Sequence, residues 1–206
     1  MSVKVKICGI TNLADALAAA EAGADMLGFM FYHQSPRHLT LPAAGEIARQ
    51  LPPHLVKVGV FVNPPEAFVL RAIRECGLTL LQFHGDEPPE FCTQFTVMSI
   101  KAFRIQDAQS LQSLATYPTH AWLLDAYVPG QPGGTGATFN WDLAVQAQKL
   151  GRPIFLAGGL TPHNVAEAVR RVCPFAVDVS SGVESAPGKK DPAKLSAFVA
   201  AAKGVA

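Results

Sequence analysis

The chain has 206 residues, of which 49% are hydrophobic and 16% are charged, a composition that suits one domain with a sizeable core. Its formal net charge of +1 provides no basic surface for nucleic acid or for an anionic membrane. The four cysteines are widely spaced and form no C-x-x-C pair, which favours reduced thiols over zinc or a redox dithiol. We expect no signal peptide, because the first residues include Lys4 and Lys6 and form no apolar run. No uncharged apolar stretch approaches the ~18 residues that span a bilayer. We therefore expect a cytoplasmic protein, with residues 1–206 in one domain.

The first predicted strand covers residues 3–8, where Val3, Val5 and Ile7 alternate with more polar residues. Cys8 ends this strand and faces the same way as Lys6, two positions earlier. A thiol with a cation beside it has a route to thiolate character. The structural alternative is that Cys8 is a small buried hydrophobic residue.

Strand-like and helix-like segments alternate eight times along the chain. Further strands are predicted over residues 26–31, 56–62, 79–83, 97–103, 121–125, 153–157 and 175–179. Most of the predicted helices begin at a capping residue or at a proline. The first is capped by Thr11 or Asn12, and the others begin at Pro42, Asn63 with Pro64, Asp86 with Pro88, residue 108, Asn140, Thr161 with Pro162, and Asp191 with Pro192.

Eight βα units with short connections predict an α/β protein with a single (β/α)8 fold, a TIM barrel. An open doubly wound sheet is the alternative, but it is expected to show G-x-G-x-x-G after the first strand, where only Gly9 is present. In a barrel, functional groups lie at the C-terminal ends of the strands and in the loops that follow them. The candidate site residues are therefore sought at those positions.

A phosphate site is predicted after the last two strands. Gly158 and Gly159 precede a helix, and Ser180, Ser181 and Gly182 follow the neighbouring strand. Glycines let the backbone approach an anion closely, and backbone N–H groups with hydroxyls can bind it. Either motif alone is compatible with an ordinary tight turn, but the pair on adjacent strands favours phosphate.

Asp125 ends the sixth predicted strand, opposite Cys8 across a barrel. A thiol and a carboxyl group in this arrangement form a natural acid–base pair, although a helix cap or a salt bridge would also explain Asp125. The connection after Asp125 is long for a βα loop, and long loops in compact domains are commonly lids. Its glycines are Gly130, Gly133, Gly134 and Gly136.

Two further loops contain polar side chains. Arg37 follows the second strand. It is either a solvated surface charge or a guanidinium that binds a planar carboxylate through two hydrogen bonds. His84 follows Gln82 at the end of the fourth strand, and a structural histidine that bonds to its own loop is the alternative to a site residue. The other histidines show no ligand spacing, so we expect no metal.

The motifs together resemble the phosphoribosylanthranilate isomerase family over essentially the whole chain. The matching stretches are KICGIT (6–11), GFMFY (28–32), SPR (35–37), QFHG (82–85), LLD (123–125), GGTG (133–136), FNW (139–141), AGGL (157–160), VDVSSGVE (177–184) and PGKK (187–190). The first and last of these motifs are highly specific. The resemblance implies an Amadori rearrangement of N-(5-phosphoribosyl)anthranilate to 1-(2-carboxyphenylamino)-1-deoxyribulose 5-phosphate, without a cofactor. This is the third step of the tryptophan branch from chorismate.

The resemblance also implies roles for individual residues. Cys8 is the general base, Asp125 is the general acid, and Arg37 holds the anthranilate carboxylate. Gly158, Gly159, Ser180 and Ser181 hold the phosphate. From their positions after the predicted strands, we expect Gly182 to belong to the same phosphate site, and Gln82 and His84 to contact the substrate. We further expect Lys6, with Asp178 on the eighth strand, to support the thiolate of Cys8.

There are three alternatives to the isomerase function. A different phosphate-binding barrel, such as indole-glycerol-phosphate synthase or thiamine phosphate synthase, would share the last two loops but lack the pair of Cys8 and Asp125. A Schiff-base aldolase would use a lysine near a strand end, for which Lys101 is the candidate. A non-catalytic barrel would bind a phosphorylated metabolite without turnover. The expected partner is a small phosphorylated sugar, and the chain is expected to act as a monomer or a homodimer.

Overall fold

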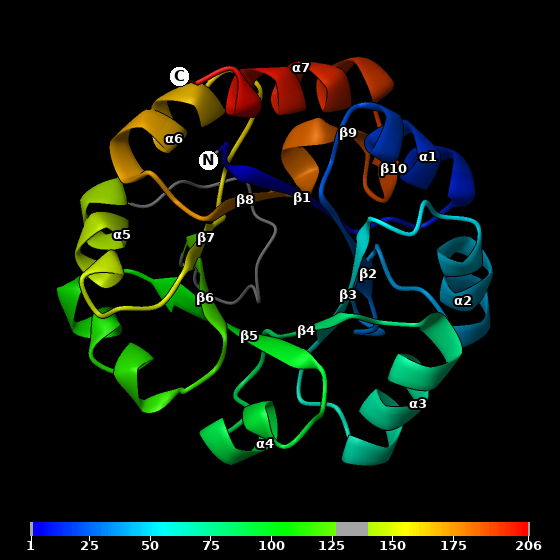
Figure 1. Cartoon of the computed structure of the whole chain (residues 1–206), viewed down its shortest axis with the longest axis horizontal. Coiled ribbons are helices and arrows are strands. Elements are labelled where there is room, and N and C mark those ends of the chain that lie inside the picture. Colours follow the sequence, from blue (N-terminus) through cyan, green and yellow to red (C-terminus); the bar gives the residue numbers. More distant parts are fainter. Residues whose placement is uncertain (1, 127–139, 206) are drawn as a thin grey trace.

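The protein is described from a computed structural model that covers residues 2–126 and 140–205. Eight parallel strands close into a barrel in chain order, and the helices surround it (Figure 1). The strands are β1 (Lys4–Cys8), β2 (Met26–Met30), β3 (Val56–Phe61), β4 (Leu80–Phe83), β5 (Met98–Ile105), β6 (Ala121–Ala126), β7 (Ile154–Leu156) and β8 (Ala176–Val179). The prediction of a (β/α)8 TIM barrel is therefore confirmed.

Most connections between strands contain an α-helix. The helices are α1 (Leu13–Glu21), α2 (Leu41–Arg49), α3 (Glu66–Cys76), α4 (Pro89–Thr93), α5 (Trp141–Gln148), α6 (Val165–Val172) and α7 (Pro192–Lys203). After β8 a 3₁₀ turn, η3 (Ser181–Val183), leads into a small hairpin made of β9 (Glu184–Ala186) and β10 (Lys189–Lys190). No helix among residues 2–126 and 140–205 is both long and apolar enough to cross a membrane.

The register of the strands places the chemistry at one rim. β1 closes the barrel against β8 with Lys6 opposite Asp178, and it pairs with β2 so that Cys8 lies opposite Gly28. All eight strands run in the same direction, so their carboxyl ends gather at one end of the barrel.

The strands are buried on both faces, which explains their apolar runs. One cluster fills the barrel interior and includes Cys8, Val60 and Leu123. A second cluster lies between the strands and the helices and includes Phe29 and Trp122. Because side chains alternate along a strand, Cys8 at the end of β1 points into the barrel and not toward the helices.

The helix predicted over residues 108–115 is wrong. The structure has two short 3₁₀ helices there, η1 (Ala108–Leu111) and η2 (Leu114–Thr116). Asp107 and Ser110 bond to each other's backbone N–H groups in a capping box, and such local bonds compete with an α-helix. Leu111 and Leu114 are also three residues apart, which matches the three-residue turn of a 3₁₀ helix.

The predicted caps are partly confirmed. The side chains of Asn12, Asn140 and Asp191 accept hydrogen bonds from the first turns of α1, α5 and α7. Asn63 and Asp86 do not cap helices. Asn63 is left-handed, at φ 48°, and its Oδ1 accepts a 2.7 Å bond from the backbone N–H of Asp86, so it joins two loops instead.

The helix expected at Thr161 begins later, as α6. Asn164 precedes this helix, and its Oδ1 accepts a 2.8 Å bond from the backbone N–H of Thr161. The predicted lid, with its four glycines, lies within residues 127–139 and therefore outside the described residues.

Candidate active site

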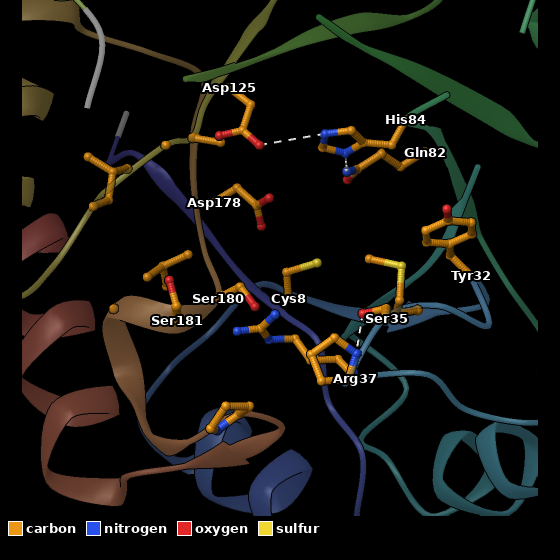
Figure 2. A pocket seen from close by; sticks show the side chains of 18 of the residues that line it. Cys8, Tyr32, Ser35, Arg37, Gln82, His84, Asp125, Asp178, Ser180 and Ser181 are labelled. Atoms are coloured by element: carbon orange, nitrogen blue, oxygen red, sulfur yellow. Dashed lines mark hydrogen bonds and ion pairs between the residues drawn. The ribbon is translucent and has the colours of Figure 1, made fainter. Parts of the chain in front are cut away.

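A cavity of about 420 Å³ opens at the carboxyl ends of the strands (Figure 2). Eleven of the twelve site residues predicted from the sequence line it, and only Lys6 lies below its surface. The eleven are Cys8, Arg37, Gln82, His84, Asp125, Gly158, Gly159, Asp178, Ser180, Ser181 and Gly182. The fold thus brings together residues that are up to 174 positions apart in the sequence (8 to 182).

Cys8 lies above a buried ion pair. The ammonium group of Lys6 has no exposed side-chain surface and donates a 2.8 Å hydrogen bond to Oδ1 of Asp178. This contact follows from the register, because Lys6 and Asp178 are direct partners on β1 and β8. The pair therefore places one cation and one anion directly beneath the thiol.

These groups have opposing effects on the thiol. Burial raises the pKa of Cys8, and Asp178 adds to this effect, whereas Lys6 and Lys190 act in the opposite direction. Burial prevails, so the pKa of Cys8 lies above its ordinary value and the thiol is protonated in the unliganded protein. Burial disfavours the charge on Lys6, but Asp178 and Cys8 together outweigh burial and raise the pKa of Lys6. Lys6 is therefore a permanent cation beside Cys8.

Asp125 enters the cavity from β6. Its Oδ1 accepts a 2.8 Å hydrogen bond from the backbone N–H of Ala126, and its Oδ2 lies 3.6 Å from Nε2 of His84. The imidazole is oriented from its other side, because Nδ1 of His84 lies 3.1 Å from Nε2 of Gln82. Figure 2 shows Asp125, His84 and Gln82 in this order along one wall.

Three polar atoms in the cavity are buried without a hydrogen-bond partner among the described residues. They are Oε1 of Gln82, Nε2 of His84 and Oγ of Ser180. Buried polar groups in folded proteins are normally satisfied, so unsatisfied groups that face a cavity indicate a place for a polar ligand.

The loops after β7 and β8 form a cradle of backbone. Gly158 and Gly159 adopt positive φ values of 83° and 61°, which favour glycine. A methyl group on Gly158 would lie 2.6 Å from the backbone nitrogen of Ala126, and one on Gly182 would collide with the carbonyl of Leu160. The two loops therefore approach each other at backbone distance, as an anion site requires.

Arg37 is not a solvated surface charge. Its guanidinium forms two hydrogen bonds with Glu184, from Nε at 2.8 Å and from Nη2 at 2.7 Å, and only 13% of its side chain is exposed. Glu184 also accepts a 2.9 Å bond from Lys190, whose ammonium is fully buried. No role was predicted for Glu184 and Lys190, although they end the matching stretches VDVSSGVE and PGKK.

The Schiff-base alternative finds no support in the position of Lys101. Its ammonium is buried, donates to the carbonyl of Gly85 at 2.6 Å and pairs with Glu87 at 3.1 Å. Lys101 does not line the cavity. Within the described part of the chain, no three His, Cys, Asp or Glu side chains are grouped as metal ligands would be.

This arrangement supports proton transfer on a bound anion. A thiol and a carboxyl group enter the cavity from β1 and β6, and a backbone cradle lies between β7 and β8. An acid and a base on different sides of one small molecule can protonate it at one atom and deprotonate it at another.

Comparisons with known proteins agree with this chemistry. The family model described as N-(5′-phosphoribosyl)anthranilate (PRA) isomerase matches residues 5–201. The N-(5′-phosphoribosyl)anthranilate isomerase of Geobacter sulfurreducens is 57% identical over 202 residues, which cover 98% of this chain and 99% of the relative. The crystal structure of phosphoribosyl anthranilate isomerase from Thermotoga maritima superposes with a TM-score of 0.93 at 42% identity, covering 98% and 99% of the two chains.

A further solved structure is a phosphoribosyl anthranilate isomerase in complex with reduced 1-(o-carboxyphenylamino)-1-deoxyribulose 5-phosphate. It superposes with a TM-score of 0.90 at 41% identity, over 98% of this chain and 99% of the other. A thiamine phosphate pyrophosphorylase from Pyrococcus furiosus has a TM-score of 0.73 but is only 13% identical, so it shares the fold alone. Fold, cavity and full-length sequence similarity agree, and the chain belongs to the N-(5′-phosphoribosyl)anthranilate isomerase family.

Proposed function

We propose that this chain performs its reaction with Cys8 as general base and Asp125 as general acid. The chain is an isomerase of tryptophan biosynthesis that acts on N-(5′-phosphoribosyl)anthranilate, as its family does. One observation carries the assignment of roles: the thiol of Cys8 and the carboxyl group of Asp125 enter the same cavity from different walls. Both groups belong to residue types that transfer protons in enzymes.

The two anionic ends of the substrate match two anion-binding regions of the cavity. The phosphate binds to Gly158, Gly159, Ser180 and Ser181, where backbone N–H groups and the unpartnered hydroxyl of Ser180 are available. The anthranilate carboxylate binds to Arg37 on another wall. The ribose carbons that react then lie between these anchors, within reach of Cys8 and Asp125.

Ring opening and enolamine formation need two proton transfers, one at the ring oxygen and one at C2, the two atoms bonded to C1 on either side. Asp125 protonates the ring oxygen as its bond to C1 breaks, and the nitrogen lone pair forms an iminium at C1. Cys8 then removes the proton from C2, and the electrons of the C–H bond neutralise the iminium to give an enolamine. The enolamine tautomerises to the ketone. Because the iminium accepts the electrons, positioned acid and base groups suffice, each typically contributing about 10²–10⁴-fold.

The proton inventory balances within the site. In the unliganded protein the buried thiol of Cys8 keeps its proton. A thiolate with a carboxylic acid carries the same number of protons as a thiol with a carboxylate. The active form is therefore reached by moving one proton within the site, and no proton has to be added from solvent. Lys6, a fixed cation beside Cys8, stabilises the thiolate that results.

One chain provides every residue used in this scheme, because all of them line one cavity except Lys6, which is buried beneath it. We accordingly propose that residues 1–206 form one catalytic domain that works as a monomer or within a homodimer. The Thermotoga maritima enzyme is described as dimeric and has also been crystallised as monomers. Sedimentation equilibrium gives the oligomeric state of the chain. An activity measurement on the same sample shows whether that form is catalytically active.

The activity assay follows the loss of fluorescence of N-(5′-phosphoribosyl)anthranilate. The wild-type chain should turn it over, and Asp125→Asn should lower kcat by at least about 100-fold, in line with the loss of a general acid. Asp142→Asn, which alters an exposed carboxylate on α5, is the matched control and should leave kcat unchanged. Equal activity of Asp125→Asn and the control would refute the role given to Asp125.

A further inference from the structure

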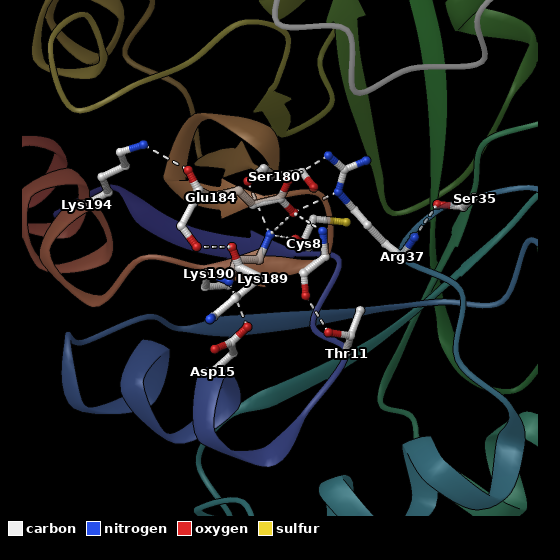
Figure 3. A network of polar contacts seen from close by, with 12 residues as sticks. Cys8, Thr11, Asp15, Ser35, Arg37, Ser180, Glu184, Lys189, Lys190 and Lys194 are labelled. Carbon is white, nitrogen blue, oxygen red and sulfur yellow. Dashed lines mark hydrogen bonds and ion pairs between the residues drawn. The ribbon is translucent and has the colours of Figure 1, made fainter.

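The hairpin that follows β8 carries a buried cluster of charges beside the active site. Glu184, at its start, has 5% of its side chain exposed, and Lys190, at its end, has none. Figure 3 shows both side chains in one network of polar contacts with Arg37 and Cys8. Charged groups are rarely buried at this depth unless each one is paired, so the function of this cluster needs an explanation.

Glu184 binds Arg37 in one defined orientation. The carboxylate accepts from Nε and Nη2, which lie along one side of the guanidinium. A guanidinium has five N–H donors, so both N–H groups of Nη1 and the second one of Nη2 remain for other acceptors. No residue in the described part of the chain accepts a hydrogen bond from Nη1. These remaining donors lie at the outer end of the guanidinium, where they can bind a second planar carboxylate.

The path of the Arg37 side chain is restricted as well. Its methylene groups cross Gly9, and a methyl group at that position would collide with Cδ of Arg37. The backbone N–H of Arg37 donates a 3.1 Å bond to Oγ of Ser35. Arg37 is thus fixed at its backbone, along its chain and at one side of its guanidinium.

Glu184 is itself immobilised. Its Oε1 accepts 2.9 Å from Nζ of Lys190, and the same ammonium donates to the carbonyls of Cys8 at 2.6 Å and Ser180 at 3.2 Å. The backbone carbonyl of Glu184 accepts a 2.8 Å bond from Lys194 on α7. Burial opposes ionisation of Glu184, but bonds from Arg37 and Lys190 outweigh burial and lower its pKa. Glu184 is therefore a charged, stationary partner.

We propose that Glu184 is a positioning residue of the isomerase. It holds the Arg37 guanidinium so that the N–H groups of Nη1 and the second N–H of Nη2 face the substrate carboxylate. The proposal rests on the role given to Arg37 above. An arginine that is already ordered loses less side-chain entropy on binding, and preorganisation of this kind raises affinity. Glu184 does not line the cavity, and its effect on substrate binding is exerted through Arg37.

The test is a double-mutant cycle on the full-length enzyme with Arg37→Ala, Glu184→Gln and the double variant. Glu184→Gln should raise the KM for N-(5′-phosphoribosyl)anthranilate about tenfold or more, as expected when one charged hydrogen-bonded partner is lost. Its kcat should change by less than about threefold, because the carboxylate is charged in both the ground state and the transition state. In the Arg37→Ala background, the same change should alter KM by less than about twofold.

Ser185→Ala is the matched control, because Ser185 lies in the same hairpin and, among the described residues, its hydroxyl bonds only to the carbonyl of Lys189. It should have the KM of the wild type. If Glu184→Gln does not fold, as judged by circular dichroism, Glu184→Asp takes its place: it keeps the charge but withdraws the carboxylate from Arg37, and it should give the same pattern.

Two results would overturn the proposal. One is a wild-type KM in the Glu184 variant together with a raised KM in Arg37→Ala. The other is a Glu184 effect of equal size with and without Arg37, which would show that it acts on the fold. A wild-type KM in Arg37→Ala is a different outcome, since it would refute the role of Arg37 itself.

Discussion

The reactivity of Cys8 depends on a balance between burial and neighbouring charges. Lys6 and Lys190 favour the thiolate, whereas burial and Asp178 favour the thiol. In the unliganded structure burial is the larger effect. A protonated thiol is protected from alkylation and oxidation, because the thiolate is the reactive form.

This balance predicts a slow, high-pH reaction of Cys8 with iodoacetamide. The thiolate is the nucleophile, and the pKa of Cys8 is raised, so the pH at half-maximal rate should lie above that of N-acetylcysteine. Peptide mass spectrometry separates Cys8 from the exposed Cys173. A midpoint below pH 7 for Cys8 would mean that the cations prevail over burial.

At the level of elements, β2 is shaped to leave room for the thiol on β1. Gly28 is the register partner of Cys8, and a methyl group at Gly28 would lie 2.9 Å from Sγ and 3.2 Å from Cα of Cys8. Real Cβ atoms do not approach this closely, so any larger residue here displaces the thiol. The resemblance motif contained Gly28, but a sequence alone does not show which atom lies opposite it.

Gly28→Ala should therefore lower kcat about tenfold or more, because small misplacements of a reacting group cost large factors in rate. The fluorescence assay gives the effect. Gly151→Ala is the control, since Gly151 has a positive φ of 86° but no atom within 4 Å of its new methyl group. That variant should lose stability with kcat unchanged. An unchanged kcat in Gly28→Ala would show that the thiol tolerates displacement.

The hairpin of β9 and β10 connects the ends of β1 and β8. The ammonium of Lys190 bonds to the carbonyls of Cys8 and Ser180, and the backbone N–H of Lys190 donates a 2.7 Å bond to Asp15 on α1. The hydroxyl of Thr11 also donates to the carbonyl of Gly188. One buried cation thus connects the end of β1 at Cys8 with the start of the loop after β8 at Ser180.

Lys190→Met should destabilise the protein by about 3 kcal/mol, because it removes one partner of a buried ion pair. Lys189→Met is the matched control: Lys189 is the neighbouring residue but is exposed, and its loss should change stability by less than about 0.5 kcal/mol. Urea unfolding followed by circular dichroism measures both. Similar midpoints for the two variants would contradict the structural role of Lys190.

The site residues that are single groups at strand ends were predictable, and those that act through partners were not. Cys8, Asp125 and the loops after β7 and β8 follow directly from where apolar runs end. Arg37 was identified but left between two roles, because its partner Glu184 is 147 positions away. Similarly, the sequence could not show that Asn63 joins two loops instead of capping a helix, since that depends on the position of Asp86.

At the level of the whole molecule, the ends of the chain meet where the barrel closes. Asp25 pairs with Lys4 of β1 at 2.8 Å and with Lys203 of α7 at 2.9 Å, and it accepts a 2.9 Å bond from the backbone of Val5. Burial opposes its charge, but these bonds outweigh burial and lower the pKa of Asp25. The eight-strand order was predictable because every unit repeats one pattern, whereas this contact between the first and last elements was not.

The depressed pKa of Asp25 makes its contribution to stability depend on pH. Such a carboxylate stabilises the folded state above its unfolded pKa of about 3.9, and the contribution is lost as the pH falls through the lower folded value. Asp25→Asn should cost about 1 kcal/mol at pH 7, since the group is partly exposed. The difference from wild type should vanish near pH 2.

Thermal unfolding between pH 7 and pH 2 measures this effect. Asp142→Asn, which breaks an exposed pair with Arg171, is the control and should follow the wild-type curve. If Asp25→Asn is as stable as wild type at pH 7, then Asp25 does not help to hold the two ends of the chain together.

The central claim is that the thiol of Cys8 is the base, and the turnover of Cys8→Ser tests it most directly. A hydroxyl is far less acidic than a thiol, so we expect kcat to fall by at least about 100-fold. The affinity for reduced 1-(o-carboxyphenylamino)-1-deoxyribulose 5-phosphate, measured by calorimetry, should stay within about threefold of wild type, because the anchors at Arg37 and the phosphate loops are intact. A kcat close to wild type in Cys8→Ser would contradict the account, because position 8 would then only fill space.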